Sequence, residues 1–87
     1  MLQQIDHPRK WSARMRRPEL SLYLLEVHGI RLSVATLAKL AVYGGGPAFQ
    51  YDGRFPVTAP QWADEFATAR LGPVRTSTSS AGHQLAV

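Results

Sequence analysis

The feature that most constrains the fold of this chain is an Asp-Gly pair, Asp52-Gly53, between two short segments of alternating apolar residues. The alternating positions on the two sides of the pair are Phe49, Tyr51, Phe55 and Val57. A two-residue Asp-Gly loop in this setting is a strong short-range indication of a β-hairpin. An isolated hairpin is only marginally stable in water, so this one must pack against other elements of the chain.

A helix is predicted directly before the hairpin, from Ser33 to about Tyr43. Ser33 is a favourable N-cap, and Leu37 and Leu40 are spaced to form a buried edge. Three consecutive glycines and then Pro47 end the helix, because proline cannot continue it. A helix that leads straight into a tight β-ribbon is the arrangement of a winged helix-turn-helix.

An earlier helix is predicted between Pro18, which is tolerated in a first helical turn, and Gly29, a typical residue just past a helix end. Its spacing at i, i+3, i+4 and i+7 predicts a buried face made of Leu20, Tyr23, Leu24 and Val27. Only a few residues join this helix to the next one across the glycine, which matches a helix-turn-helix. The second helix is then the candidate recognition helix.

A third helix is predicted after the hairpin. Thr58 is its expected N-cap, Pro60 lies in its first turn, and Gln61 completes a capping box. Trp62 and Phe66 lie four residues apart and are expected in the core, and a Gly-Pro pair ends the helix. The predicted fold is therefore mainly α with a small β-hairpin, a winged helix-turn-helix of three helices and a two-stranded wing.

Three segments are expected along the chain. Residues 1–17 show no hydrophobic periodicity and are expected to form a basic, flexible arm. Residues 18–72 are expected to form a winged helix-turn-helix DNA-binding domain. Residues 73–87 are rich in Ser and Thr and are expected to form a disordered tail.

Charge indicates a polyanionic partner. The 87 residues include ten Lys and Arg against six Asp and Glu, which gives a net charge of +4 and a pI near 10.1. Basic fields of this kind attract phosphate, although composition alone does not separate nucleic acid from an acidic protein or a lipid surface. Half of the basic residues lie in one run of the arm, at Arg9, Lys10, Arg14, Arg16 and Arg17. This run is interpreted either as a set of phosphate contacts or as a solvated arm.

Residues for catalysis or metal binding are not found in a supporting pattern. The chain has no cysteine, and its three histidines, at positions 7, 28 and 83, are far apart in the sequence. Ser33 and Thr36 have no nearby base, and the side chains of Asp64 and Glu65 diverge on a helix. We therefore expect no enzyme activity, no cofactor and no metal. No stretch approaches the roughly 18 apolar residues of a membrane span, and no secretory signal is seen, so a cytoplasmic location is expected.

The order of these features resembles a known family. A GI-x-x-S-x-x-T-L segment, a GGGP break, a short hairpin with Gly-Arg at its tip and a final helix are similar to the excisionase-type, MerR-like winged helix-turn-helix proteins. The resemblance covers roughly residues 20–79 and includes the recombination directionality factors, among which the chain looks most like the RdfS-type excisionases of integrative and conjugative elements. It implies DNA binding without catalysis. In the family the factor binds attachment-site DNA, often as several copies side by side, bends it, and biases a tyrosine recombinase toward excision.

The resemblance also implies which residues contact DNA. Ser33, Thr36 and Lys39 match recognition-helix positions, and Gly53-Arg54 matches the tip of the wing. Two further candidates follow from position alone: Arg31 in the turn between the helices and Tyr43 at the end of the second helix. The predicted DNA-binding residues are Arg31, Ser33, Thr36, Lys39, Tyr43 and Arg54, with the five basic residues of the arm as additional phosphate contacts.

One departure from the family pattern affects how DNA would be read. Relatives usually carry more Arg or Lys on the exposed face of the recognition helix, whereas here Ala35, Ala38 and Val42 lie beside Lys39. Small apolar residues there would touch thymine methyl groups or a neighbouring protein copy. Two alternative functions stay open. One is a transcriptional regulator of a mobile element or prophage, and the other is a protein-interaction adaptor that uses the basic arm against an acidic partner.

Overall fold

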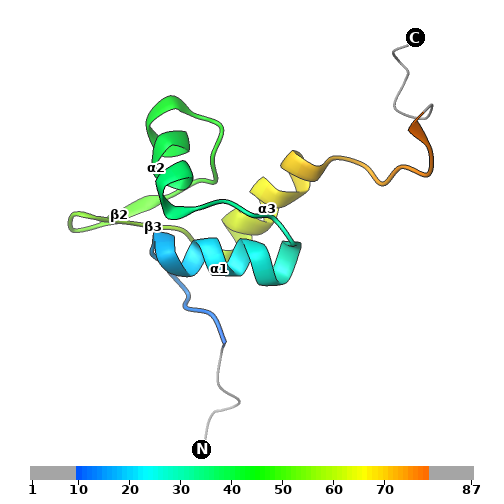
Figure 1. Cartoon of the computed structure of the whole chain (residues 1–87). Helices are drawn as coiled ribbons and strands as arrows, with labels where there is room; N and C mark the ends of the chain where they lie inside the picture. Colours follow the sequence, from blue (N-terminus) through cyan, green and yellow to red (C-terminus); the bar gives the residue numbers. More distant parts are fainter. Residues whose placement is uncertain (1–9, 79–87) are drawn as a thin grey trace, which may run out of the picture.

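A computed structural model describes residues 10–78, which fold into three helices and a two-stranded antiparallel sheet (Figure 1). In chain order the elements are α1 (Arg17–His28), α2 (Val34–Tyr43), β2 (Gln50–Asp52), β3 (Phe55–Val57) and α3 (Pro60–Leu71). The predicted class is confirmed, since the chain is mainly helical with a small hairpin in a winged helix-turn-helix layout. Within residues 10–78 no helix has the length and apolar character needed to cross a membrane.

The turn between α1 and α2 is fixed by backbone and side-chain hydrogen bonds. Gly29 has a φ of 70°, a left-handed conformation that ends α1 as predicted. The amide of Gly29 donates to the Leu25 carbonyl at 3.0 Å and that of Ile30 to the Leu24 carbonyl at 2.9 Å, so two carbonyls at the end of α1 are satisfied. The Ser21 hydroxyl donates to the Leu32 carbonyl at 2.6 Å. These bonds and the burial of Ile30 set the direction in which α2 leaves the turn.

The buried face of α1 differs from the prediction at one residue. Leu20, Tyr23 and Leu24 are buried as expected. Val27 is 48% exposed, so its prediction as a core residue is wrong. It has the right spacing, but the last turn of α1 lies at the edge of the core.

The glycine run after α2 is needed for a close approach of the backbone. Gly44 and Gly45 have φ values of 94° and 93°, in a region that side chains disfavour. A Cβ atom on Gly46 would lie 2.9 Å from the Cβ of Leu40. The chain can therefore fold back over the end of α2 and start β2 only with glycine at these positions.

The hairpin forms where predicted, but its turn lies one residue further along the chain. The paired residues are Gln50 with Val57, Tyr51 with Pro56, and Asp52 with Phe55. The loop therefore consists of Gly53 and Arg54, and not of Asp52 and Gly53. The prediction was wrong because Gly53, with a φ of 65°, takes the first loop position, while Asp52 belongs to the ladder. This register puts Arg54 at the tip.

The segment before α1 is part of the domain. Met15 is completely buried, and its amide and carbonyl pair with the backbone of Thr58 at 2.9 and 2.8 Å. The ring of Trp11 packs edge-on against that of Tyr23, with centroids 5.2 Å apart. The prediction of a flexible arm through residue 17 is therefore wrong for residues 10–17. Hydrophobic periodicity did not reveal this packing because it involves residues distant in the sequence. Thr58, the partner of Met15, lies more than forty positions away, and Tyr23, the partner of Trp11, is on α1.

The remaining parts of the predicted arm and tail are only partly described. Residues 1–9, which include Arg9, and residues 79–87 lie outside the described range. Residues 73–78 are exposed.

The start of α3 also departs from the prediction. Its N-cap is Ala59, without a side-chain cap, so the capping box of Thr58 and Gln61 is absent. The Thr58 hydroxyl instead donates to the Ala48 carbonyl at 3.1 Å, and its backbone is paired with Met15. Thr58 thus ties together the segments before and after the hairpin.

The face that α3 buries is made of small residues. Ala63 and Ala67 are fully buried and allow a close approach to α1. Phe66 is half-buried against the core, whereas Trp62 is only partly buried and lies outside the core cluster. The prediction of a core position is therefore met by Phe66 and not by Trp62.

A hydrogen-bonded cluster joins the end of α1 to α3. The Asp64 carboxylate accepts a hydrogen bond from the Tyr23 hydroxyl at 2.6 Å and lies 2.8 Å from His28 Nε2. The hydrogen bond from Tyr23, with a smaller effect of His28, holds the pKa of Asp64 below its ordinary value. Burial, together with the bond to Asp64, raises the pKa of Tyr23 to about 12.

The direction of these pKa shifts predicts how stability depends on pH. Asp64 is a stronger acid in the folded chain, so its contribution is present above its ordinary pKa of 3.8 and is lost as the pH falls further. Asp64→Asn should cost about 1 kcal/mol near neutral pH, and this difference should shrink below about pH 4. Urea unfolding of both proteins over that range tests the prediction.

Two further variants serve as controls for this cluster. Tyr23→Phe should cost stability below pH 10, with a difference from the wild type that shrinks as the pH rises toward 12. Glu65→Gln makes the same carboxylate-to-amide change at the exposed neighbouring position and should leave the stability within about 0.5 kcal/mol of the wild type near neutral pH. A constant gap between Asp64→Asn and the wild type from acidic to neutral pH would contradict the assignment.

Candidate nucleic-acid interface

The outer face of α2 presents three of the predicted DNA-binding residues together. Thr36, Lys39 and Tyr43 follow one another at i, i+3 and i+7, so they share one side of the helix. That side points away from Leu37, which is buried in the core. All three are exposed, and Tyr43 is 85% exposed. An exposed tyrosine at a helix end offers a hydroxyl donor to a ligand.

Ser33 has a different role from Thr36. Its Oγ accepts the hydrogen bond of the Thr36 amide at 3.1 Å, which confirms it as the N-cap of α2. The Ser33 hydroxyl also donates to Thr36 Oγ1 at 3.0 Å. Its one hydroxyl hydrogen is therefore used inside the helix end, while that of Thr36 stays available to an external acceptor. Ser33 supports the site by capping the helix and by orienting Thr36.

Arg54 is exposed at the tip of the hairpin. Within residues 10–78 its guanidinium has no hydrogen-bonding or ionic partner. The hairpin and α2 project from the same side of the domain, at the left of Figure 1, and α3 lies toward the other side. The two elements predicted to contact DNA thus lie on the same side of the domain, with α2 above the hairpin in this view.

Arg31 lies in the turn just before α2. It is exposed, and it borders a shallow depression with Leu25 of α1 and Ser33. No acceptor for its guanidinium is found in the described part of the chain. Its position next to the start of α2 fits the predicted role of holding a phosphate.

Two basic residues of the predicted arm are engaged inside the domain. Lys10 Nζ lies 2.7 Å from Glu26 Oε1, in an exposed ion pair. Arg14 Nε donates to Gln50 Oε1 at 3.1 Å, and its guanidinium lies 5.2 Å from the centre of the Trp62 ring. Arg14 therefore braces β2 against α3. Both residues were predicted from the sequence as phosphate contacts, and the sequence pattern did not indicate these partners.

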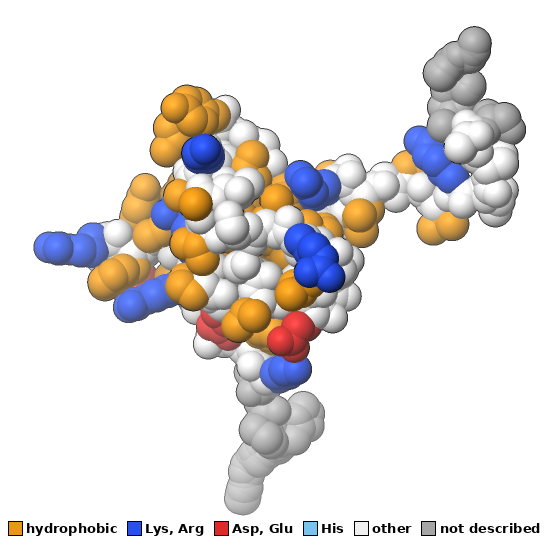
Figure 2. Space-filling view, in the orientation of Figure 1, with side chains coloured by type: hydrophobic (Ala, Val, Ile, Leu, Met, Phe, Trp, Pro, Cys, Tyr) orange, Lys and Arg blue, Asp and Glu red, His pale blue; other side chains and the backbone are white. Residues whose placement is uncertain are grey.

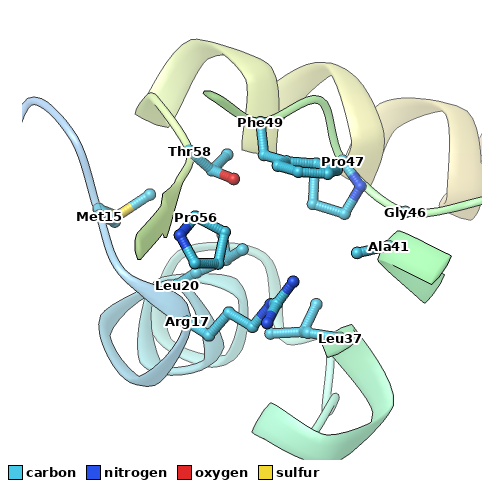
Figure 3. A pocket seen from close by; sticks show the side chains of 10 residues that line it. All are labelled: Met15, Arg17, Leu20, Leu37, Ala41, Gly46, Pro47, Phe49, Pro56 and Thr58. Carbon is cyan, nitrogen blue, oxygen red and sulfur yellow. The ribbon is translucent and has the colours of Figure 1, made fainter. Parts of the chain in front are cut away.

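The other two described members of the run reach the hairpin. The Arg16 guanidinium lies 3.8 Å above the centre of the Phe55 ring. Arg17 lies between Leu37 of α2 and Pro56 of β3, where Figure 3 shows its guanidinium among apolar side chains. The structure thus brings Arg16 and Arg17, but not Lys10 and Arg14, toward the predicted interface. Arg9 is outside the described residues.

The charged side chains are unevenly distributed over the face seen in Figure 2. Lys and Arg side chains lie over α2, at the far end of the hairpin and over the right-hand part of the domain. Acidic side chains gather low in the view, with a basic side chain beside them, near the point where the N-terminal segment leaves the domain. Hydrophobic side chains are exposed beside the basic ones, at the end of α2 and along the hairpin. They belong to Val42, Tyr43, Tyr51 and Phe55.

Neither metal-binding clusters in the described residues nor comparisons with known proteins indicate a function. Among residues 10–78 no three His, Asp or Glu side chains come together in a way that would hold a metal ion. No protein-family model, curated protein or solved structure matches the chain. We therefore infer the function from the geometry of α2, the hairpin and the start of α1.

The contacts of Arg14 predict a stability effect that is separate from binding. Arg14→Ala removes the bond to Gln50 and the stacking on Trp62, and we expect a loss of about 1 kcal/mol, or about 4–8 °C in Tm. Thermal unfolding measures it, with Arg54→Ala as the matched arginine control that should leave Tm unchanged. Equal Tm values for the two variants would show that Arg14 does not brace the hairpin.

Proposed function

We propose that this protein is a small, sequence-specific DNA-binding factor of the excisionase type, acting on attachment-site DNA in the cytoplasm as part of the nucleoid. In this role it would bend the site and bias a tyrosine recombinase toward excision, without catalysis of its own. The observation that carries the proposal is a pair of exposed cations, Lys39 on α2 and Arg54 on the hairpin, that have no partner among residues 10–78 and belong to elements on the same side of the domain. The resemblance to excisionases supplies the narrower role.

The size and the exposed chemistry of α2 suit a major groove. Its ten residues make a helix about 15 Å long, and the groove is about 12 Å wide and admits one helix. Lys39 is in the middle of the outer face, where it can reach a phosphate or a guanine edge. Thr36 supplies a hydroxyl donor at the helix start, a part of a helix that is favourable for phosphate.

The hairpin suits the neighbouring minor groove. A narrow minor groove has an enhanced negative potential that attracts arginine, and Arg54 is at the outermost point of the ribbon. With only one lysine on the outer face of α2, the wing and the shape of the DNA carry much of the recognition. This division follows the departure from the family pattern seen in the sequence.

The small apolar residues of α2 have two uses in this proposal. Ala35, Ala38 and Val42 lie next to the face of Lys39, and Val42 is 75% exposed. They either touch thymine methyl groups or contact a second copy bound side by side on the DNA. A transcriptional regulator would use the same contacts at a promoter, and it is the runner-up.

Substitution of the two cations tests DNA binding directly. Lys39→Ala and Arg54→Ala should each lower the affinity for a selected duplex about 5–10-fold at a stated salt concentration, with an unchanged Tm. Arg70→Ala, in the last turn of α3, removes the same charge at a residue that is not among the predicted DNA contacts and should change affinity less than about twofold. Unchanged affinity in both interface variants would rule out this surface as the DNA contact.

A genome-wide footprint distinguishes the candidate functions. Repeated footprints spaced by about one helical turn, with bending of the DNA, are expected for an excision factor. A single footprint over a promoter, with altered transcript levels, would favour the regulator. Failure to retain any duplex at low salt would instead support a protein-interaction adaptor that uses the basic segment.

A further inference from the structure

A groove of about 300 Å³ separates α2 from the hairpin, next to the start of α1. Its floor is apolar, and two arginines border it. The residues that line it are Arg16, Arg17, Pro18, Val34, Phe55 and Pro56. The groove therefore lies between the two elements that the proposed function places in adjacent DNA grooves.

Arg17 borders this groove, and its guanidinium has no interaction partner among residues 10–78. It is partly buried at the first position of α1, and it also borders the small pocket drawn in Figure 3. In the described part of the chain no carboxylate, carbonyl or aromatic ring pairs with its guanidinium. The pocket beside it, of about 20 Å³, has room for about one water molecule. The partly exposed guanidinium keeps its N–H groups available beside apolar side chains, so this position is suited to a negatively charged ligand.

Arg16 is held at the other edge of the groove. Its guanidinium carbon lies 3.8 Å from the centre of the Phe55 ring, and this cation–π contact favours its position. No hydrogen-bond acceptor for it is found among residues 10–78, which leaves its N–H groups available at the rim. Two arginines thus converge on one apolar groove from the start of α1.

In B-form DNA one sugar–phosphate strand separates a major groove from the adjacent minor groove. With α2 in the first and the hairpin in the second, that strand must cross the surface between them. We infer that this groove binds that single sugar–phosphate strand, with Arg17 and Arg16 on successive phosphates and Val34, Phe55 and Pro56 against the deoxyribose. The inference rests on the proposed function and adds to it the occupant of the space between helix and wing.

Both the arginines and the apolar floor of the groove match the chemistry of a sugar–phosphate strand. A guanidinium forms two parallel hydrogen bonds to a phosphate, a geometry that lysine does not offer. A deoxyribose presents mainly C–H groups, which suit an apolar floor. An acidic protein segment would match the arginines but would not place a phosphate between the two grooves, which makes the two occupants separable by experiment.

Neutral phosphates test the contact of Arg17. A duplex selected by the wild-type chain is prepared with one methylphosphonate at each position in turn. The wild-type protein should lose about 5–10-fold in affinity at one or two positions between the major-groove and minor-groove contacts. Arg17→Gln should bind the unmodified duplex with a similar loss, should lower the slope of log affinity against log salt by about one, and should be insensitive to the modification at the same position. Arg70→Gln is the control and should keep the wild-type pattern.

A charge on the floor tests the groove independently of Arg17. Val34→Asp puts a carboxylate at the first position of α2, where an acid favours the helix and none is now present in the first turn. We therefore expect an unchanged or higher Tm but at least a tenfold loss of duplex affinity. Gln61→Asp adds the same charge to the first turn of α3 and should leave the affinity within about twofold.

The outcomes separate the inference from the function on which it rests. If the wild-type chain binds duplex through Lys39 and Arg54 but no phosphate couples to Arg17, and Val34→Asp binds normally, the groove is not the path of the strand. If the wild-type chain binds no duplex at all, both proposals fail. Binding of an acidic peptide that Arg17→Gln abolishes, without any phosphate coupling, would also overturn the inference.

Discussion

The backbone pairing of Met15 with Thr58 is the contact on which the rest of the domain depends. It joins the segment before α1 to the segment between the hairpin and α3 by two hydrogen bonds, with the Met15 side chain completely buried beside them. Three consequences follow from this one closure. The hairpin is held at its base. Thr58 is paired and does not cap α3, whose N-cap is the next residue, Ala59. The basic residues just after Met15 lie beside the hairpin.

The basic run thereby divides into residues with different roles, although its sequence looks uniform. Lys10 pairs with Glu26, and Arg14 bonds to Gln50 and stacks on Trp62, so these two stabilise the domain. Arg16 and Arg17 come after the pairing and border the groove between α2 and the hairpin. Lys10 and Arg14 precede the paired residue Met15 in the chain, and Arg16 and Arg17 follow it.

Local rules predicted the parts of the fold that local physics decides. The cap at Ser33, the stop at Gly29 and the hairpin after Pro47 each follow from a few neighbouring residues, and each is present. Predictions failed where a distant partner intervened, as at Thr58, which pairs instead of capping. The outer positions of Thr36, Lys39 and Arg54 could be predicted from spacing. The partners of Arg14 and Arg16 and the position of Arg17 beside the groove could not, because they depend on tertiary contacts.

The base of the hairpin is fixed by contacts with the domain, whereas its loop is exposed. This difference affects the free energy with which the tip binds a ligand. Near the base, Gln50 is bonded to Arg14 and Val57 is buried, whereas the loop of Gly53 and Arg54 is exposed and includes the most permissive residue type. A ligand at the tip must order that loop, at a cost in conformational entropy, while the base is already in place. Affinity gained by stiffening the loop would therefore require no new contact with the ligand.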